Sequence, residues 1–374
     1  MTIRENILSI LRFGSYDRFP MVAFGYWDET VKKWVGEGHI PQEDADAYYA
    51  TGDNGDGDKA IMKRLGFDYN WSTTFPAQFS LFPAFEEALL EEKPDGSRII
   101  RDNAGLICMV KPGVISIPAE VGTTLTGREA WEELYLPKFR WSEERVDIDR
   151  IKTISAPEDR EIPAGLYCGS LMGTMRNLLG VEALSYLYAD DEELFEEIAY
   201  TFADIAYRCV KKSLESGAVF DYAHFWEDIC FKTGPLVHPE VFARVAGPGY
   251  KKITALLAEY GIDIVSLDCD GMIGHLIPTW INNGVNTMFP IEVGTWHASI
   301  APWREKYGNV IKGVGGMDKR VFAYDYAAVD REVERLLPLV KLGGYIPCPD
   351  HRIAPDAKFE NVQYYCERMR KALG

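Results

Sequence analysis

Short apolar runs that are typical of β-strands recur along the chain, and segments with helical spacing separate many of them. The clearest helical segments are residues 194–210 (LFEEIAYTFADIAYRCV) and 329–340 (VDREVERLLPLV), where apolar side chains recur every three to four positions. In the second half of the chain, strand and helix alternate with short connections. The strand-like runs are residues 21–24, 107–110, 166–168, 219–222, 262–267, 285–289, 310–314 and 344–347.

This alternation predicts parallel strands joined by crossover helices. Eight candidate strands in 374 residues favour a closed (β/α)₈ TIM barrel, predicted to be a single domain over residues 1–374. The competing architecture is an open doubly wound sheet, but no glycine-rich phosphate-binding motif follows an early strand. The first half is less regular, and its Trp- and Pro-rich stretches predict loop insertions over one face of the barrel.

Composition and charge limit the classes of partner. Asp and Glu total 57 against 40 Lys and Arg, which gives a net charge of −17. Such a surface repels phosphate backbones and anionic lipid, so we expect neither a nucleic acid nor a membrane partner. The first thirteen residues, MTIRENILSILRF, predict a docked amphipathic helix rather than a secretory signal. Seven scattered cysteines without a CxxC pair are typical core residues of a cytoplasmic protein.

The acidic segment 52–58 (GDNGDGD) suggests a calcium loop at first sight. No reading frame, however, places acidic residues at positions one, three and five with Gly at six and Glu at twelve. We therefore predict a solvated turn.

The residues with candidate chemistry follow directly after four strand-like runs of the second half. Barrel enzymes build their sites where strands pass into loops, so we expect these side chains to meet at one rim. They are Glu227 and Asp228, Asp268 and Asp270, Glu292, and Asp350 with His351 and Arg352.

The spacing of Asp268 and Asp270 is the most specific feature of this set. In an extended chain residues i and i+2 point to the same side, so both carboxylates project together. Such a pair shares either a proton or a cation, and Glu292 or His351 could complete a set of oxygen and nitrogen ligands for Zn²⁺, Mn²⁺ or Fe²⁺. The alternative is that Asp268 and Asp270 only cap the helix that begins near residue 273.

Three further residues are candidates for substrate binding. Trp226 lies beside the predicted rim, where an aromatic side chain could line a cleft for a flat ligand, although core packing explains most aromatic residues. His224 and His238 are equally compatible with the site and with ordinary loop positions. Glu227 and Asp228 fit either the site or a salt-bridged rim.

Five segments, in order, resemble the uroporphyrinogen decarboxylase superfamily, whose fold is a (β/α)₈ barrel. They are residues 226–239 (WEDICFKTGPLVHP), 260–271 (YGIDIVSLDCDG), 284–292 (GVNTMFPIE), 306–319 (KYGNVIKGVGGMDK) and 343–364 (GGYIPCPDHRIAPDAKFENVQY). True decarboxylases of this superfamily carry an N-terminal Arg-Gln-Ala-Gly-Arg signature for the carboxylates of the substrate. Residues 21–28 (MVAFGYWD) lack that arginine pair, and Asp68 lacks the usual surrounding sequence.

The resemblance is closer to the branch of corrinoid-dependent methyltransferases. Members that methylate thiols hold zinc with a His-x-Cys pair and a later Cys, and the matching positions here are Asp268, Asp270 and His351. The resemblance therefore implies a zinc site without thiolate ligands, which suits an ether or alcohol oxygen better than a thiol. It also implies that Glu227, Asp228 and Glu292 act as catalytic residues that orient substrate or relay a proton.

Our first hypothesis is thus a methyltransferase that moves a methyl group from an O-methyl compound, such as a methoxylated aromatic, to a corrinoid. The chain has no corrinoid-binding DxHxxG motif, so a separate corrinoid protein is the expected partner. The alternatives are decarboxylation of a tetrapyrrole or another carboxylated compound, and a non-catalytic barrel that binds a tetrapyrrole or corrinoid.

Overall fold

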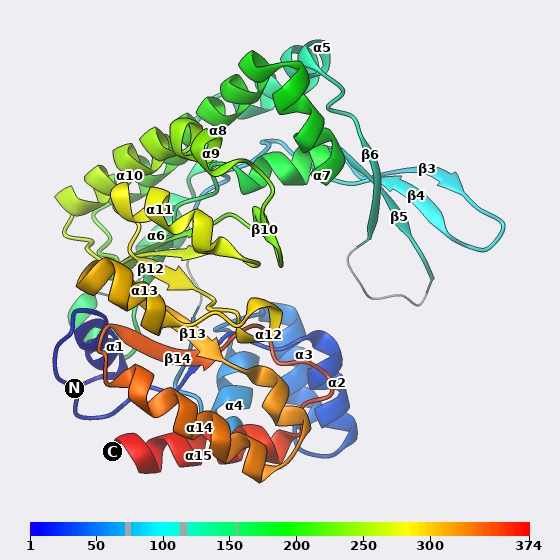
Figure 1. Cartoon of the computed structure of the whole chain (residues 1–374). Coiled ribbons are helices and arrows are strands. Elements are labelled where there is room, and N and C mark those ends of the chain that lie inside the picture. Colours follow the sequence, from blue (N-terminus) through cyan, green and yellow to red (C-terminus); the bar gives the residue numbers. More distant parts are fainter. Residues whose placement is uncertain (72–75, 113–117, 155) are drawn as a thin grey trace.

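The computed structural model describes residues 1–71, 76–112, 118–154 and 156–374. Its centre is a set of parallel strands whose carboxyl ends all point to one side (Figure 1). Six of them hydrogen-bond in the order β14-β13-β12-β11-β8-β7, and β1 pairs with β2. A parallel bridge between Tyr26 and Ile353 links the end of β1 to the end of β14. The strands are β1 (Val22–Ala23), β2 (Tyr69–Asn70), β7 (Gly165–Tyr167), β8 (Tyr222–Trp226), β11 (Val265–Asp268), β12 (Thr287–Phe289), β13 (Lys312–Met317) and β14 (Tyr345–Pro349).

This arrangement confirms the predicted (β/α)₈ barrel fold, and it corrects one of the predicted strands. The run 107–110 does not belong to the barrel, because it lies in a separate antiparallel sheet. The eighth barrel strand is β2, which is only two residues long and escapes a search for apolar runs. The other seven runs correspond to barrel strands with boundaries shifted by a few residues.

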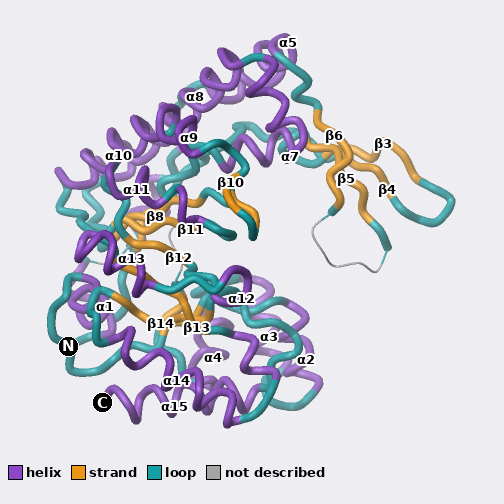
Figure 2. The backbone as a smooth tube through the Cα atoms, viewed as in Figure 1, coloured by secondary structure: helices purple, strands orange, loops and turns teal. Residues whose placement is uncertain are grey.

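Helices surround the strands on the outside (Figures 1 and 2). The predicted helical segments fall within α8 (Glu192–Glu215) and α14 (Tyr326–Val340). The N-terminal segment forms α1 (Ile3–Leu11), as predicted: its apolar side is buried, and Thr2 and Glu5 close a capping box at its start. The other α-helices are α2 (Asp28–Gly36), α3 (Gln42–Thr51), α4 (Asp56–Leu65), α5 (Arg128–Ala130), α6 (Ile148–Lys152), α7 (Gly173–Asp190), α9 (Pro239–Val245), α10 (Gly247–Glu259), α11 (Ile277–Asn282), α12 (Val293–Trp296), α13 (Ile300–Tyr307) and α15 (Phe359–Leu373).

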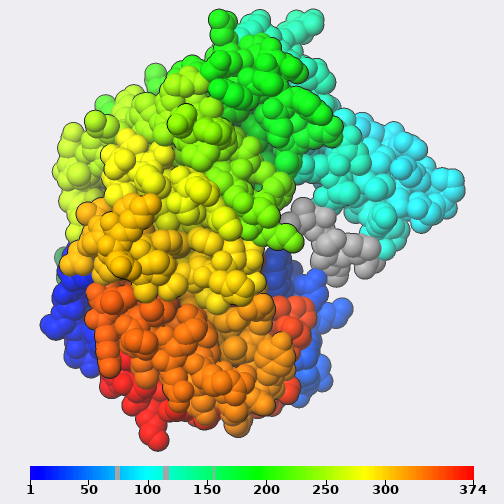
Figure 3. Space-filling model, in the orientation of Figure 1, coloured from blue at the N-terminus to red at the C-terminus, as the bar shows by residue number. Residues whose placement is uncertain are grey.

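Two insertions leave the barrel on the side of its strand ends. The larger is an antiparallel sheet that stands away from the body of the molecule (Figures 1 and 3). We call it the arm: β3 (Ala88–Glu92), β4 (Arg98–Arg101), β5 (Leu106–Val110) and β6 (Ala119–Thr123). The smaller insertion is a hairpin of β9 (Cys230–Phe231) and β10 (Gly234–Pro235). The arm accounts for the irregular pattern of the first half of the chain. The hairpin belongs to the second half.

Aromatic side chains fill the barrel interior below its rim. The Tyr69 and Tyr222 hydroxyls lie 2.8 Å apart, and the Trp71 ring stacks on Tyr222 with 4.5 Å between the ring centroids. All seven cysteines are free and buried, as expected of core residues. The barrel interior is therefore a packed core.

Residues 52–55 form a partly exposed turn, as predicted, whereas residues 56–58 begin α4. Asp58 is fully buried, and its carboxylate accepts hydrogen bonds from the Asn54 amide (2.7 Å) and the Asn70 side chain (3.0 Å). Burial raises the pKa of Asp58 to about 6. The neighbouring Asp53 pairs with Arg352, which follows β14. This segment therefore contacts both β2, through Asn70, and the rim, through Arg352. Local composition cannot reveal such contacts.

Candidate active site

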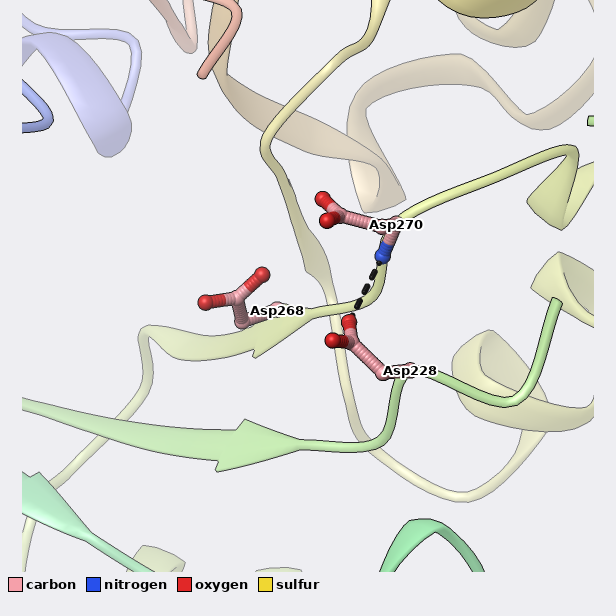
Figure 4. A group of neighbouring side chains, drawn as sticks. All are labelled: Asp228, Asp268 and Asp270. Atoms are coloured by element: carbon pink, nitrogen blue, oxygen red, sulfur yellow. Dashed lines mark hydrogen bonds between the residues drawn. The ribbon is translucent and has the colours of Figure 1, made fainter. Parts of the chain in front are cut away.

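Three aspartates meet at the ends of two adjacent strands (Figure 4). Asp268 is the last residue of β11, Asp270 follows two residues later, and Asp228 follows β8. One ligand oxygen from each lies within 4.8 Å of the other two. The Asp270 amide donates to Asp228 Oδ1 at 2.9 Å, which fixes the two loops relative to each other. Asp228 has a positive φ of 38°, an unusual backbone conformation that turns its side chain toward Asp270.

Burial and mutual repulsion disfavour the charged forms of Asp228 and Asp268. Burial first, and the charge of Asp270 second, raise the pKa of Asp228 to about 6. Burial first, and then the charges of Asp228 and Asp270, hold the pKa of Asp268 well above its ordinary value. Asp270 Oδ1 is buried and has no hydrogen-bond partner among the described residues. The cluster therefore favours a shared proton or a bound cation.

His351 contacts this cluster from the end of β14. Its Nε2 lies 3.3 Å from Asp270 Oδ2, and its ring stacks on Trp27. Its Nδ1 accepts a hydrogen bond from the Arg352 amide at 2.8 Å, so a neutral ring carries its proton on Nε2. A ring in this arrangement donates to Asp270. His351 lies beside the three aspartates and contacts one of them, and its expected role as a metal ligand stays a prediction.

Glu292 follows β12 and holds the loop that carries Asp270 and Gly271. Its Oε2 accepts from the Gly271 amide at 2.5 Å, and its Oε1 accepts from Thr295 Oγ1 at 2.8 Å. Burial, and then the charge of Asp270, raise the pKa of Glu292. Glu292 is thus part of the rim, as predicted, with a position suited to orienting Asp270.

Glu227 occupies a different place from the one expected. It is fully buried, and its carboxylate accepts hydrogen bonds from Ser170 Oγ, from the amides of Leu171, Met172 and Gly173, and from the Tyr250 hydroxyl. A Cβ at Gly173 would lie 1.8 Å from the Glu227 carbonyl oxygen, so this close approach requires glycine. The geometry contradicts a proton-relay role and makes Glu227 the anchor of the turn between β7 and α7.

Two of the three expected substrate-binding residues also lie elsewhere. His224 is buried inside the barrel, where its Nδ1 lies 3.0 Å from Ser266 Oγ, and burial lowers its pKa to about 3. His238 is exposed and caps α9 through the Glu240 amide. Trp226 does lie at the rim, half-buried, with the Arg176 guanidinium 5.7 Å from its ring. Its role in substrate binding stays a prediction.

The rim also holds two basic residues, Lys319, which the sequence pattern did not single out, and Arg352, which was expected at a strand end. Lys319 follows β13, its Nζ donates to the Arg352 carbonyl at 2.8 Å, and burial lowers its pKa. Arg352 is held by Asp53 and by the Tyr26 carbonyl oxygen. Asp350, named above only as a strand-end residue, accepts hydrogen bonds from three amides, those of Val293, Gly294 and Lys319. The signal for Lys319 was available, because it also follows a strand directly.

The donor set fits a divalent cation. Asp228, Asp268 and Asp270 offer three oxygens that lie close together, and the orphaned Asp270 Oδ1 is a polar atom whose burial is costly without a partner. Three carboxylates without a thiolate are a hard ligand set, which zinc, manganese and magnesium accept. Compared with the expected set, Asp228 is an additional candidate ligand.

Comparison with known proteins places the chain in a family. A family model described as uroporphyrinogen decarboxylase matches residues 128–372, well over half of the chain. The chain belongs to the uroporphyrinogen decarboxylase family. This confirms the resemblance drawn from the five sequence segments. A search of curated proteins by sequence found no match.

Solved structures share the fold at low sequence identity. A methyltransferase from Methanosarcina mazei is 14% identical, with a TM-score of 0.60 and coverage of 100% of both chains. A B12-independent methionine synthase from a Shewanella species, in complex with selenomethionine, is 12% identical with a TM-score of 0.48 and covers 95% of this chain and 99% of its own. At such identities the likeness of the methyltransferase shows the barrel fold alone.

In the described part of the chain, we find no helix with the length and apolar character that crossing a bilayer requires.

Proposed function

We propose that this protein transfers a methyl group from an O-methyl compound, such as a methoxylated aromatic, to a reduced corrinoid on a separate protein. The observation that carries the proposal is the cluster of Asp228, Asp268 and Asp270 at the barrel rim. The cysteine between two of these acids, Cys269, is buried and its pKa is raised well above the ordinary value. The rim therefore offers oxygen ligands and proton donors rather than thiolates, which suits an oxygen leaving group.

The chemistry of O-demethylation explains why such a cluster is useful. The bond between the methyl carbon and the ether oxygen breaks, the methyl carbon passes to the cobalt of the reduced corrinoid, and the electron pair stays on the oxygen. That oxygen needs a proton or a positive charge. Asp228, with its pKa raised to about 6, and Asp268 both retain protons at higher pH than ordinary carboxyl groups. They can therefore protonate the departing phenolate or alkoxide.

A metal ion is the second way in which the same residues can act. Asp228, Asp268 and Asp270 would hold it, and zinc is our first expectation. When bound, the ion would supply a Lewis acid for the ether oxygen. His351 would then keep Asp270 oriented through the contact at Nε2, and Glu292 would hold the adjoining turn at Gly271.

A methyl-transfer assay tests this proposal. The purified protein is incubated with reduced cobalamin, or with reduced corrinoid proteins, and a panel of methoxyarenes, and the demethylated product is measured with and without added Zn²⁺ or Mn²⁺. We expect product with at least one methoxyarene, and loss of product in Asp268→Asn. Failure of every methoxyarene with every acceptor, in a protein that binds no metal, would exclude the proposal.

Decarboxylation is the second candidate, because the matching family model carries that name. A porphyrinogen with many carboxylates requires several free cations, yet the rim is dominated by acids and Arg352 is already paired with Asp53. The acidic rim therefore argues against this substrate class. Turnover of uroporphyrinogen by the purified protein would establish decarboxylation in place of methyl transfer.

A further inference from the structure

The arm presents an apolar face that no described helix or strand covers. By strand alternation and register, Ile99 lies opposite Met109 and Arg101 lies opposite Ile107, so that three apolar side chains and one guanidinium share this face. The three apolar side chains are half-buried, yet they contribute to neither of the two hydrophobic cores. The opposite face carries Leu106 and Cys108, which are buried. A sheet that is apolar on both faces and covered on one is typical of an interaction surface.

The covered face fixes the arm to α7. Thr123 Oγ1 donates to the Leu178 carbonyl at 2.6 Å, and the Val181 amide donates to Glu120 Oε2 at 3.1 Å. Gly180, with a φ of 75°, lies between these contacts, and a Cβ there would meet Glu120 Oε2 at 2.9 Å. The arm is therefore held at the kink of α7 at Gly180, in addition to its two chain connections.

The start of the same helix is tied to the active-site rim. The amides of Met172 and Gly173 donate to Glu227, and the next residue, Asp228, belongs to the aspartate cluster. From Gly173 to Leu178 the helix rises about 8 Å. A molecule that rests on the arm is thus placed at a set position relative to the cluster. Figures 1 and 3 show the arm on the side to which the barrel strands point, standing off from the barrel body.

Charge indicates what kind of molecule fits this surface. Between residues 86 and 111 of the arm, six side chains are acidic and four are basic, and the rim cluster is acidic too. The exposed apolar residues extend to the arm edges, where Leu89, Leu90 and Val121 are 56%, 52% and 51% exposed. A fitting partner presents an apolar centre surrounded by basic residues.

We infer that the uncovered face of the arm, formed by Ile99, Ile107 and Met109, is the docking surface for the corrinoid protein. This inference rests on the proposed function, which requires a second protein to bring cobalt to the barrel rim. The arm supplies binding surface beside the rim without occupying it. A second copy of this chain is a poorer occupant, because its own acidic surface would be repelled.

The test compares two methyl acceptors of different size. Variants Ile99→Glu and Met109→Glu place a charge on the docking face, while Val310→Glu is the matched control. Val310 is 53% exposed and precedes β13, so it lies at the opposite end of the barrel from the rim. Each variant is assayed with free reduced cobalamin and with a reduced recombinant corrinoid protein that the wild-type chain methylates. Melting temperatures establish that the variants fold, and Leu90→Glu replaces any variant that does not.

We expect the KM for the corrinoid protein to rise about tenfold or more in both arm variants, with free cobalamin and the control unaffected. Added salt should raise the wild-type KM for the protein acceptor as well. An unchanged KM for the corrinoid protein would overturn the docking surface and leave the proposed function intact. Equal losses of activity with the corrinoid protein and with free cobalamin would have the same meaning. Absence of transfer by the wild-type chain to either acceptor would overturn both. Sedimentation that shows a wild-type dimer and monomeric arm variants would assign the face to a second copy instead.

Discussion

Replacing Glu227 by Gln separates a structural role from a catalytic one. The carboxylate accepts five hydrogen bonds, and Gln keeps only one oxygen. If the new amide nitrogen takes the position of Oε1, the Tyr250 hydroxyl can rotate to accept, but the Leu171 amide is left facing a donor. Loss of one bond to a charged acceptor and one unsatisfied buried amide cost about 1–3 kcal/mol each. Because neutral Gln avoids the burial of a charge, we expect a net loss of about 2 kcal/mol.

Thermal unfolding followed by circular dichroism measures this loss. For a chain of 374 residues, about 2 kcal/mol corresponds to a decrease in Tm of roughly 2–3 °C. The control is Glu182→Gln, at an exposed position of α7, and it should leave Tm unchanged. Activity well below Tm should fall far less than the roughly 10²–10⁴-fold that removal of a general acid costs. An unchanged Tm with abolished activity would refute the reasoning and return Glu227 to the catalytic residues.

The remaining predictions concern the aspartate cluster. The folded-state pKa of Asp228 is raised to about 6, so its ionisation lowers the stability of the folded protein as pH rises from about 4 to 6. Asp228→Asn removes this loss and should stabilise the metal-free protein at pH 7 by about 1–3 kcal/mol. A Tm gain at pH 4 as large as at pH 7 would contradict this. Asp270→Asn should weaken Zn²⁺ or Mn²⁺ binding in calorimetry at least about tenfold, whereas Asp56→Asn, at a 96% exposed side chain, should not. If His351 only orients Asp270, His351→Gln should weaken the same binding less than Asp270→Asn does, and an equal loss would identify His351 as a direct ligand.

The fold could be predicted from the sequence largely because seven barrel strands overlap apolar runs of three to six residues. The eighth could not, since Tyr69 stands between two polar residues, Asp68 and Asn70, and the strand depends on pairing with β1. The run at 107–110 has the same apolar character, because a strand of the arm and a strand of the barrel give the same local sequence pattern. Only contacts between distant segments distinguish them.

The site was predictable as a place but not residue by residue. Strand ends gather at one rim of a parallel barrel, so Asp268 and Asp270 could be placed there from spacing alone. Whether Glu227 or Asp228 faces the rim depends on the positive φ at Asp228, and spacing does not reveal it. Alternation along β8 could have placed His224 inside the barrel, since it shares a face with Tyr222, which is buried there.

The most direct test of the account is a single-turnover reaction with a methoxyarene labelled in its methyl group and reduced cobalamin as acceptor. We predict that label appears on cobalamin with the wild-type chain and is lost with Asp268→Asn, whose melting temperature should not fall. Equal transfer by both proteins would show that the aspartate cluster takes no part in the reaction and would contradict the account.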